Sequence, residues 1–191
     1  MDRRSLLGLL GATAAVAAAP GDLADVGRAI HRRLGGASAR RVLGPHQDAT
    51  VVALTDVILP ATDTPGAKAA RVNEFVDLLL AEWSEAQERD SFLAGLATVD
   101  TRAREMFGKD FVDGTPGDQT KLLTVLDNEA AQWNAKPRGR RGPEPFYRRM
   151  KWLTLFGYYT SQVGAEQEAH FAIIPGRFVP CAPADSTAGS E

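Results

Sequence analysis

The sequence predicts an all-α protein, a single irregular helical bundle of about five to six helices preceded by a signal peptide and a flexible arm. Several stretches repeat apolar residues at helical spacing, and none sustains the alternation typical of a half-buried strand. The chain has 191 residues, of which 44% are hydrophobic, and this is enough for one domain with its own core. We place that helical domain at residues 46–183.

The N-terminus has the pattern of an export signal. Arg3 and Arg4 stand before an uncharged apolar run, residues 5–19, in which Ala15-Val16-Ala17 fits a cleavage site. Paired arginines indicate the twin-arginine route, which carries folded proteins. The run is too short and too rich in Ala and Gly for a confident membrane span. We therefore predict a twin-arginine signal peptide at 1–17 and a mature protein in the periplasm or on the outer face of the cytoplasmic membrane.

Residues 18–45 are predicted to form an arm or linker. A short helix can run from Asp22, a suitable N-cap, to Leu34, where Gly35-Gly36 would end it. The Gly, Ala and Arg residues that follow indicate a loop. We expect this segment to contribute little to the core.

Two helices are predicted at the start of the domain. The first begins at Gln47, and Pro60 ends it. Turn-forming residues fill 61–66. The second helix has apolar residues at i, i+3, i+4, i+7, i+8 and i+11 from Val72 to Trp83, which is typical of an amphipathic helix. The apolar positions of the two helices are Val51, Leu54, Val57, Ile58, Val72, Phe75, Val76, Leu79, Leu80 and Trp83.

Two further helices follow. One has an apolar stripe from Phe92 to Met106 and ends near Gly108. The next is predicted to begin at Thr115, which can cap it, with Pro116 at the first helical position and an acid two residues later. Its apolar residues extend to Trp133.

The last predicted helix, residues 146–163, is the most apolar. From Trp152 onward its apolar residues surround the helix axis, so it lies at the centre of a bundle or presents one side to another protein. Beyond residue 183 a small polar tail, 184–191, is predicted to be disordered. The interface candidates on this helix and in the following tail are Phe146, Arg149, Trp152, Phe156, Tyr158, Tyr159 and Phe178.

The charge balance argues against a nucleic-acid protein, because 22 Lys and Arg face 24 Asp and Glu, for a net charge of −2. A basic run precedes the last helix, at Lys136, Arg138, Arg140 and Arg141. It is either a solvated loop or a site for an anionic surface, on a protein, a phospholipid or a nucleic acid. Among the binding interpretations we favour a protein, since the net charge is negative and export is predicted.

No cofactor motif is present in the sequence. It lacks G-x-G-x-x-G, a Walker A motif and C-x-x-C-H, so we predict no Rossmann-bound flavin and no c-type haem in this chain. Glu166 and His170 are four residues apart and could share a helical face, but one such pair does not make a metal site. We interpret it as a surface ion pair and predict no catalytic, cofactor-binding or metal-binding residues.

Cys181 is the single cysteine, and it lies in a tail punctuated by proline. An unpaired cysteine in an exported protein indicates an intermolecular disulfide or a free thiol. The alternative is a small residue that merely packs. We favour a disulfide with a partner.

Four stretches of the chain, taken together, resemble the gluconate 2-dehydrogenase subunit 3 family. They are Leu54-Thr55-Asp56-Val57-Ile58-Leu59-Pro60-Ala61-Thr62-Asp63-Thr64-Pro65-Gly66-Ala67, Val72-Asn73-Glu74-Phe75-Val76-Asp77, residues 151–162, and Ile174-Pro175-Gly176-Arg177-Phe178. The resemblance covers most of the predicted mature chain. The basic loop at 136–142 has no counterpart in it.

The resemblance implies a small, helical, non-catalytic subunit. Its partner would be a large flavoprotein of the glucose-methanol-choline type, which holds FAD and oxidises a sugar, sugar acid or glycoside. Some complexes of the family add a multi-haem cytochrome c, and the small subunit carries the signal with which the flavoprotein reaches the export translocase. Two alternatives stay open: a stand-alone exported helical binding protein, and a metal-dependent enzyme using Glu166 and His170.

Overall fold

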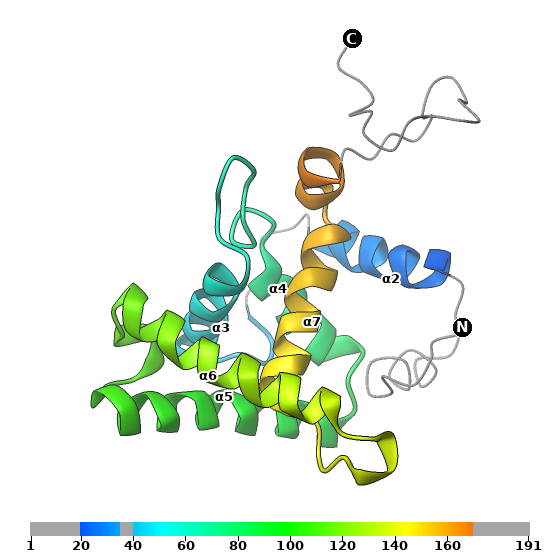
Figure 1. Cartoon of the computed structure of the whole chain (residues 1–191). Coiled ribbons are helices and arrows are strands. Elements are labelled where there is room, and N and C mark those ends of the chain that lie inside the picture. The colour runs from blue at the N-terminus through cyan, green and yellow to red at the C-terminus, as the bar shows by residue number, and fades with distance from the viewer. Residues whose placement is uncertain (1–19, 35–39, 170–191) are drawn as a thin grey trace, which may run out of the picture.

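The computed structural model describes residues 20–34 and 40–169, and none of these residues lies in a strand. The predicted all-α class is confirmed. Arg3, Arg4, His170, Phe178 and Cys181 lie outside the described residues, as do the segments 1–17 and 184–191, predicted to be a signal peptide and a polar tail. The α-helices are α2 (Pro20–Arg33), α3 (Pro45–Ile58), α4 (Val72–Glu82), α5 (Ala86–Phe107), α6 (Pro116–Ala135) and α7 (Phe146–Tyr159), with short helical turns η1 (Phe111–Asp113), η2 (Arg138–Arg140) and η3 (Gly164–Glu168) (Figure 1).

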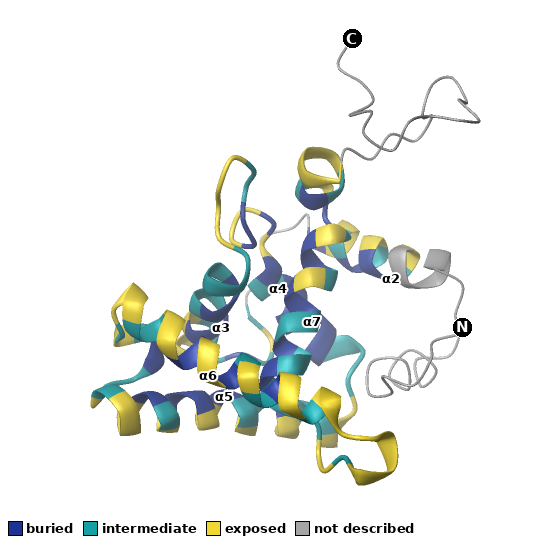
Figure 2. Cartoon of the chain, viewed as in Figure 1, coloured by how far each residue is buried: buried dark blue, intermediate teal, exposed yellow. Residues whose placement is uncertain are grey.

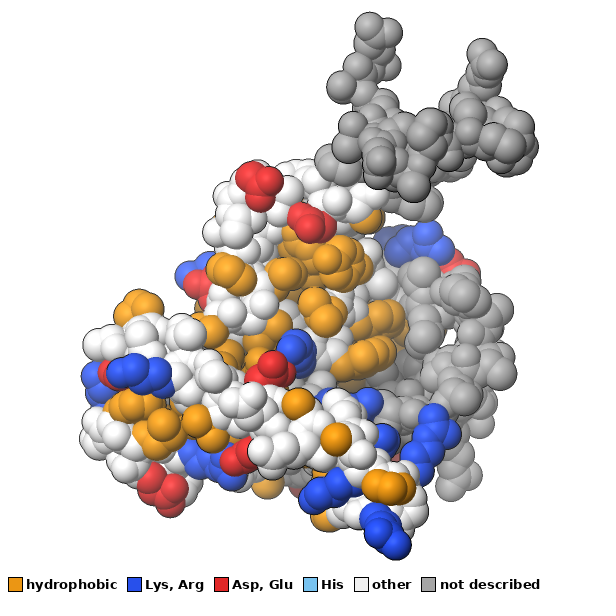
Figure 3. Space-filling view, in the orientation of Figure 1, with side chains coloured by type: hydrophobic (Ala, Val, Ile, Leu, Met, Phe, Trp, Pro, Cys, Tyr) orange, Lys and Arg blue, Asp and Glu red, His pale blue; other side chains and the backbone are white. Residues whose placement is uncertain are grey.

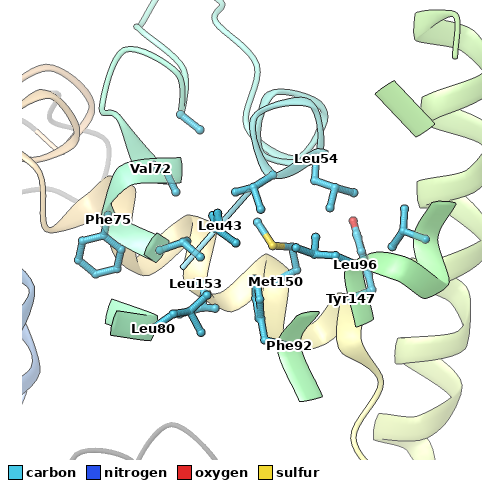
Figure 4. Close-up of a cluster of buried hydrophobic side chains, with 14 of the residues drawn as sticks. Leu43, Leu54, Val72, Phe75, Leu80, Phe92, Leu96, Tyr147, Met150 and Leu153 are labelled. Carbon is cyan, nitrogen blue, oxygen red and sulfur yellow. The ribbon is translucent and has the colours of Figure 1, made fainter. Parts of the chain in front are cut away.

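Helix α7 is the centre of the bundle. It contacts α3, α4, α5 and α6, and the latter two run side by side beneath it in Figure 1. Tyr147, Met150 and Leu153 point from α7 into a cluster of apolar side chains from its neighbours (Figure 4). Met150 is fully buried and Leu153 is 1% exposed. The apolar surplus of this helix is therefore largely core.

Local signals set the ends of the helices. Thr115 Oγ1 accepts the Asp118 N–H at 3.2 Å and caps α6, with Pro116 in the first turn. Helix α5 ends at Gly108, whose φ of 73° suits glycine. None of the described helices is long and apolar enough to span a bilayer.

Helix α2 is joined to the core more closely than an arm would be. Ile30 is fully buried, and the His31 ring stacks on Phe75 with 4.9 Å between centroids. His31 Nε2 donates a hydrogen bond to the Gly157 carbonyl at 2.7 Å. Burial lowers the pKa of His31, and this backbone hydrogen bond partly offsets the effect. This differs from the weakly attached segment that we expected at residues 18–45.

A buried carboxylate fixes the segment between α2 and α3. Asp77, on α4, is 3% exposed and accepts three backbone N–H bonds, from Arg41 at 2.8 Å, Val42 at 2.9 Å and Leu43 at 2.8 Å. These bonds satisfy the carboxylate and seat Leu43 in the core. Residues 40–44 therefore form a strap across α4.

Helix α7 ends four residues earlier than predicted. Ser161 Oγ donates to the Tyr158 carbonyl at 2.6 Å and accepts the Gly164 N–H at 3.0 Å, which turns the chain into the π-helical turn η3. A Cβ at Gly164 would lie 2.2 Å from the Tyr158 carbonyl oxygen. Only glycine allows this close approach.

Candidate partner-binding surface

The outward side of α7 carries an apolar stripe. Its members recur at i, i+3, i+4 and i+7, so they share one face of the helix. Leu155 is 36% exposed and Tyr159 is 46% exposed, both high values for large apolar side chains. Figure 3 shows hydrophobic side chains gathered over α7. We call Trp152, Leu155, Phe156 and Tyr159 the α7 stripe.

Aromatic contacts with the core support the α7 stripe. Trp152 stacks on Phe156 at 4.8 Å, and Phe156 meets the buried Phe75 edge-on at 5.6 Å. Gly157 lets α4 approach, because a Cβ there would lie 2.9 Å from the Phe75 ring. A fixed aromatic surface loses little conformational entropy when another protein covers it.

The two neighbouring tyrosines of α7 separate. Tyr158 is 1% exposed, and its hydroxyl donates to the Pro65 carbonyl at 2.6 Å. Burial raises the pKa of this phenol. Tyr158 is thus a core residue and does not present its ring to a partner, contrary to our expectation. Tyr159 points outward because it lies 100° further around the helix.

The remaining described candidates lie nearer the start of α7. Phe146 packs edge-on against Phe92, with centroids 5.2 Å apart, and is only partly buried. Arg149 is half-buried and three residues before Trp152, so it lies on the side of the helix that carries the stripe. The structure thus brings Arg149, Trp152, Phe156 and Tyr159 to one side of α7.

A hollow opens beside the far end of the stripe. Its volume is about 930 Å³, and α2, the end of α7 and η3 supply its walls. Mostly apolar surface lines it, with charged groups from Arg28, Arg32 and Glu166. A protruding ring next to a concave apolar surface suits the side chains of another protein. No sequence signal pointed to the hollow, because residues more than 120 positions apart form it.

The loop between α3 and α4 closes the same end of the bundle. Thr64 Oγ1 donates to Glu168 Oε2 at 2.5 Å, which joins the loop to η3. Gly66 fits where a Cβ would lie 2.6 Å from the Ala61 nitrogen. The Tyr158 hydroxyl completes the attachment. These turn-forming residues therefore serve the fold that supports the stripe.

The described residues contain no cluster of metal ligands. No three or more of their His, Cys, Asp and Glu side chains gather closely enough to hold a metal ion. Glu166 accepts hydrogen bonds from Gln162 at 3.1 and 3.2 Å. His170, its expected partner, lies outside the described residues.

A His–Asp pair, 54 residues apart in sequence, went unpredicted. His46 Nε2 lies 2.8 Å from Asp100 Oδ2, beside a hollow of about 270 Å³. Asp100 also accepts the Phe111 N–H at 3.1 Å. The nearby hydroxyls of Thr50 and Thr101 donate to carbonyls of their own helices, so neither is poised as a nucleophile. We assign the pair a structural role in joining α3, α5 and η1.

Residues 45–176 match the family model described as Gluconate 2-dehydrogenase subunit 3. The curated proteins and the solved structures gave no match. The family match covers well over half of the sequence and takes in every described helix except α2. The chain therefore belongs to the gluconate 2-dehydrogenase subunit 3 family, whose members are accessory subunits of a dehydrogenase complex.

Proposed function

We propose that this chain is the non-catalytic small subunit of an exported, FAD-dependent dehydrogenase of the glucose-methanol-choline type. It binds the large flavoprotein subunit, supports its folding and stability, and carries it out of the cytoplasm. The complex oxidises a sugar, sugar acid or glycoside, and a cytochrome c subunit can extend it. The observation that carries the proposal is the α7 stripe on a member of this family.

The physical logic links export to assembly. A flavoprotein takes up FAD as it folds in the cytoplasm, so it must cross the membrane already folded. The twin-arginine route accepts folded cargo. One signal, predicted here at Arg3 and Arg4, can then serve two tightly bound chains.

The binding surface in this proposal is the α7 stripe with the hollow beside it. An obligate interface buries about 2,000 Å² or more, and its core is rich in aromatic residues. Trp152 and Tyr159 are the side-chain types that dominate binding energy in such interfaces. The stripe alone is smaller than this area, so its surroundings on α2 and η3 would also be covered.

The test is co-expression with the large subunit and purification through a tag on this chain. We expect a yellow complex with a flavin absorbance spectrum. Leu155→Asp with Tyr159→Asp should lower flavin recovery by at least about tenfold, because charges would enter a desolvated contact. The matched control, Met106→Asp with Val125→Asp, changes two side chains of similar exposure, 45% and 39%, on α5 and α6. Equal flavin recovery with the two double variants would contradict the assignment of the surface.

Cys181 supplies a second test. We propose that it forms a disulfide with the large subunit once the complex reaches an oxidising compartment. A non-reducing gel of the exported complex should show one band at the summed mass, and Cys181→Ser should abolish that band. A small subunit that migrates alone without reductant would exclude the linkage.

A further inference from the structure

The loop after α6 is a concentrated source of positive charge. Residues 136–151 hold seven of the 22 Lys and Arg but one of the 24 Asp and Glu, so the rest of the chain is strongly acidic. The loop projects from the bundle at the start of α7 (Figure 1), and Figure 3 shows Lys and Arg gathered there. We call residues 136–142 the basic knob.

The knob has a defined structure. The guanidinium groups of Arg141 and Arg148 lie 4.8 and 5.1 Å from the centroid of the Trp133 ring. Trp133 Nε1 donates to the Gly142 carbonyl at 2.9 Å, and Arg141 donates to the carbonyls of Asn134 and Lys136 at 2.7 and 2.8 Å. Arg141 thereby satisfies carbonyls at the end of α6. We call these contacts among Trp133, Arg141 and Arg148 the Trp133 clamp. The clamp fixes the loop although the positive charges of the loop repel one another.

The clamp leaves three cations pointing into solvent. Lys136, Arg138 and Arg140 are exposed, and the loop after α6 is coloured as mostly exposed in Figure 2. None of the three has an acidic partner among the described residues. Arg148 and Lys151, by contrast, pair with Glu144 and Asp127. Three unpaired cations held close together create a positive potential that attracts an anionic surface.

The knob and the α7 stripe lie along one helix. Helix α7 has 14 residues and is about 20 Å long, with the knob at its start and Tyr159 at its end. Arg149, on the side of the stripe, continues the positive charge toward Trp152. A protein that covers the stripe and extends along α7 towards its start would also meet the knob.

We propose that the basic knob docks on an acidic patch of the large subunit, beside the apolar patch that covers the α7 stripe. The inference rests on the proposed function and adds the chemistry of the partner. Arginine dominates the knob, and its planar guanidinium group binds a carboxylate through two parallel hydrogen bonds. A lipid surface is less suited, because the knob exposes no large apolar side chain that could insert. Such a contact mainly speeds association and makes it sensitive to salt.

The test uses Lys136→Gln, Arg138→Gln and Arg140→Gln together, which spares the Trp133 clamp. The control removes three charges near the opposite end of α6, with Arg104→Gln, Lys109→Gln and Lys121→Gln; Arg104 and Lys109 pair there with Asp110 and Asp118. All these complexes carry Cys181→Ser as well, so that no disulfide can hold the two subunits together. Mass photometry of each purified complex then gives the dissociation constant between about 0.05 and 0.5 M salt. We expect the knob variant to bind about tenfold more weakly at low salt and to match wild type at high salt. The control variant should follow wild type throughout.

Several outcomes would overturn the proposal. Equal affinity and equal salt dependence in knob variant and wild type would refute the acidic patch while leaving the proposed function intact. Failure of wild type to bind any flavoprotein would refute both. If wild type binds phosphatidylglycerol vesicles, the knob variant does not, and both have the same affinity for the large subunit, then the knob binds lipid and not an acidic protein patch. Salt-sensitive self-association of the isolated chain, lost in the knob variant, would assign it to a second copy.

Discussion

Gly95 marks the closest approach between α5 and α7. A Cβ at this position would lie 2.1 Å from Phe146 Cδ2, on a ring that also packs against Phe92. The absence of a side chain at residue 95 therefore determines where α7 begins its path across α5.

Gly95→Ala is expected to lower the free energy of unfolding by about 1–3 kcal/mol, because the new methyl group displaces the Phe146 ring. Chemical denaturation of the isolated chain measures this. In a Phe146→Ala background the same substitution should become neutral or stabilise by up to about 1 kcal/mol, since alanine favours a helix over glycine. The same destabilisation in both backgrounds would show that Phe146 is not the obstacle.

His31 gives the stability of the chain a pH dependence. Burial lowers its pKa in the folded state, so below about pH 6.5 the unfolded chain binds more protons than the folded one. This contribution to stability is complete above that pH and is lost as the pH falls. His31→Gln can keep the bond to Gly157 without titrating.

We therefore expect wild type to lose more stability than His31→Gln between about pH 7 and pH 5. Thermal unfolding across this range measures the loss of stability in each protein. Carboxylates titrate in both proteins, so their contributions to the pH dependence cancel when the two are compared. Parallel curves for the two proteins would mean that His31 is not buried as described.

At the scale of elements, the strap at residues 40–44 depends on α4. Asp77→Ala would leave three backbone donors without their acceptor, and we expect a loss of about 3 kcal/mol in the free energy of unfolding. Urea denaturation measures this loss. The control is Asp90→Ala on the exposed side of α5, which should stay within about 0.5 kcal/mol of wild type. Similar losses in both variants would contradict the role of Asp77.

Most helices could be predicted from local patterns. The apolar repeat predicted from Val72 to Trp83 lies on α4, and Thr115 caps the start of α6 as expected. Such signals act within one or two turns of the chain, and a single sequence displays them directly. The early end of α7 could not be predicted, because it depends on how Ser161 and Gly164 fold back on Tyr158.

The candidate site was predictable only in part. Periodicity shows that α7 is apolar on all sides, but not which side its neighbours cover. Tyr158 is buried with its hydroxyl donating a hydrogen bond to the Pro65 carbonyl, 93 positions away in the sequence. Helix α2 is joined to the core through Gly157, also far along the sequence. Long-range contacts of this kind decided which aromatic residues were left on the surface.

At the scale of the whole molecule, export and assembly are predicted to act together. Arg3→Lys with Arg4→Lys should leave both subunits in the cytoplasm, folded and loaded with flavin, because the signal acts on a finished complex. Cell fractionation with a dye-linked activity assay measures this. The control, Arg40→Lys with Arg41→Lys in the strap, keeps both charges outside the proposed binding surface and should export normally. Export of the large subunit without the small one would contradict joint transport.

The α7 stripe has a consequence for the life of the chain in the cell. Under the proposed function, a copy made in excess of the large subunit would display Leu155 and Tyr159 to the cytoplasm. Chaperones and proteases recognise exposed hydrophobic surface of this kind, so surplus copies should be degraded quickly. The abundance of the small chain would then follow that of the large one without any regulatory circuit, and the ratio of the two would be corrected by turnover.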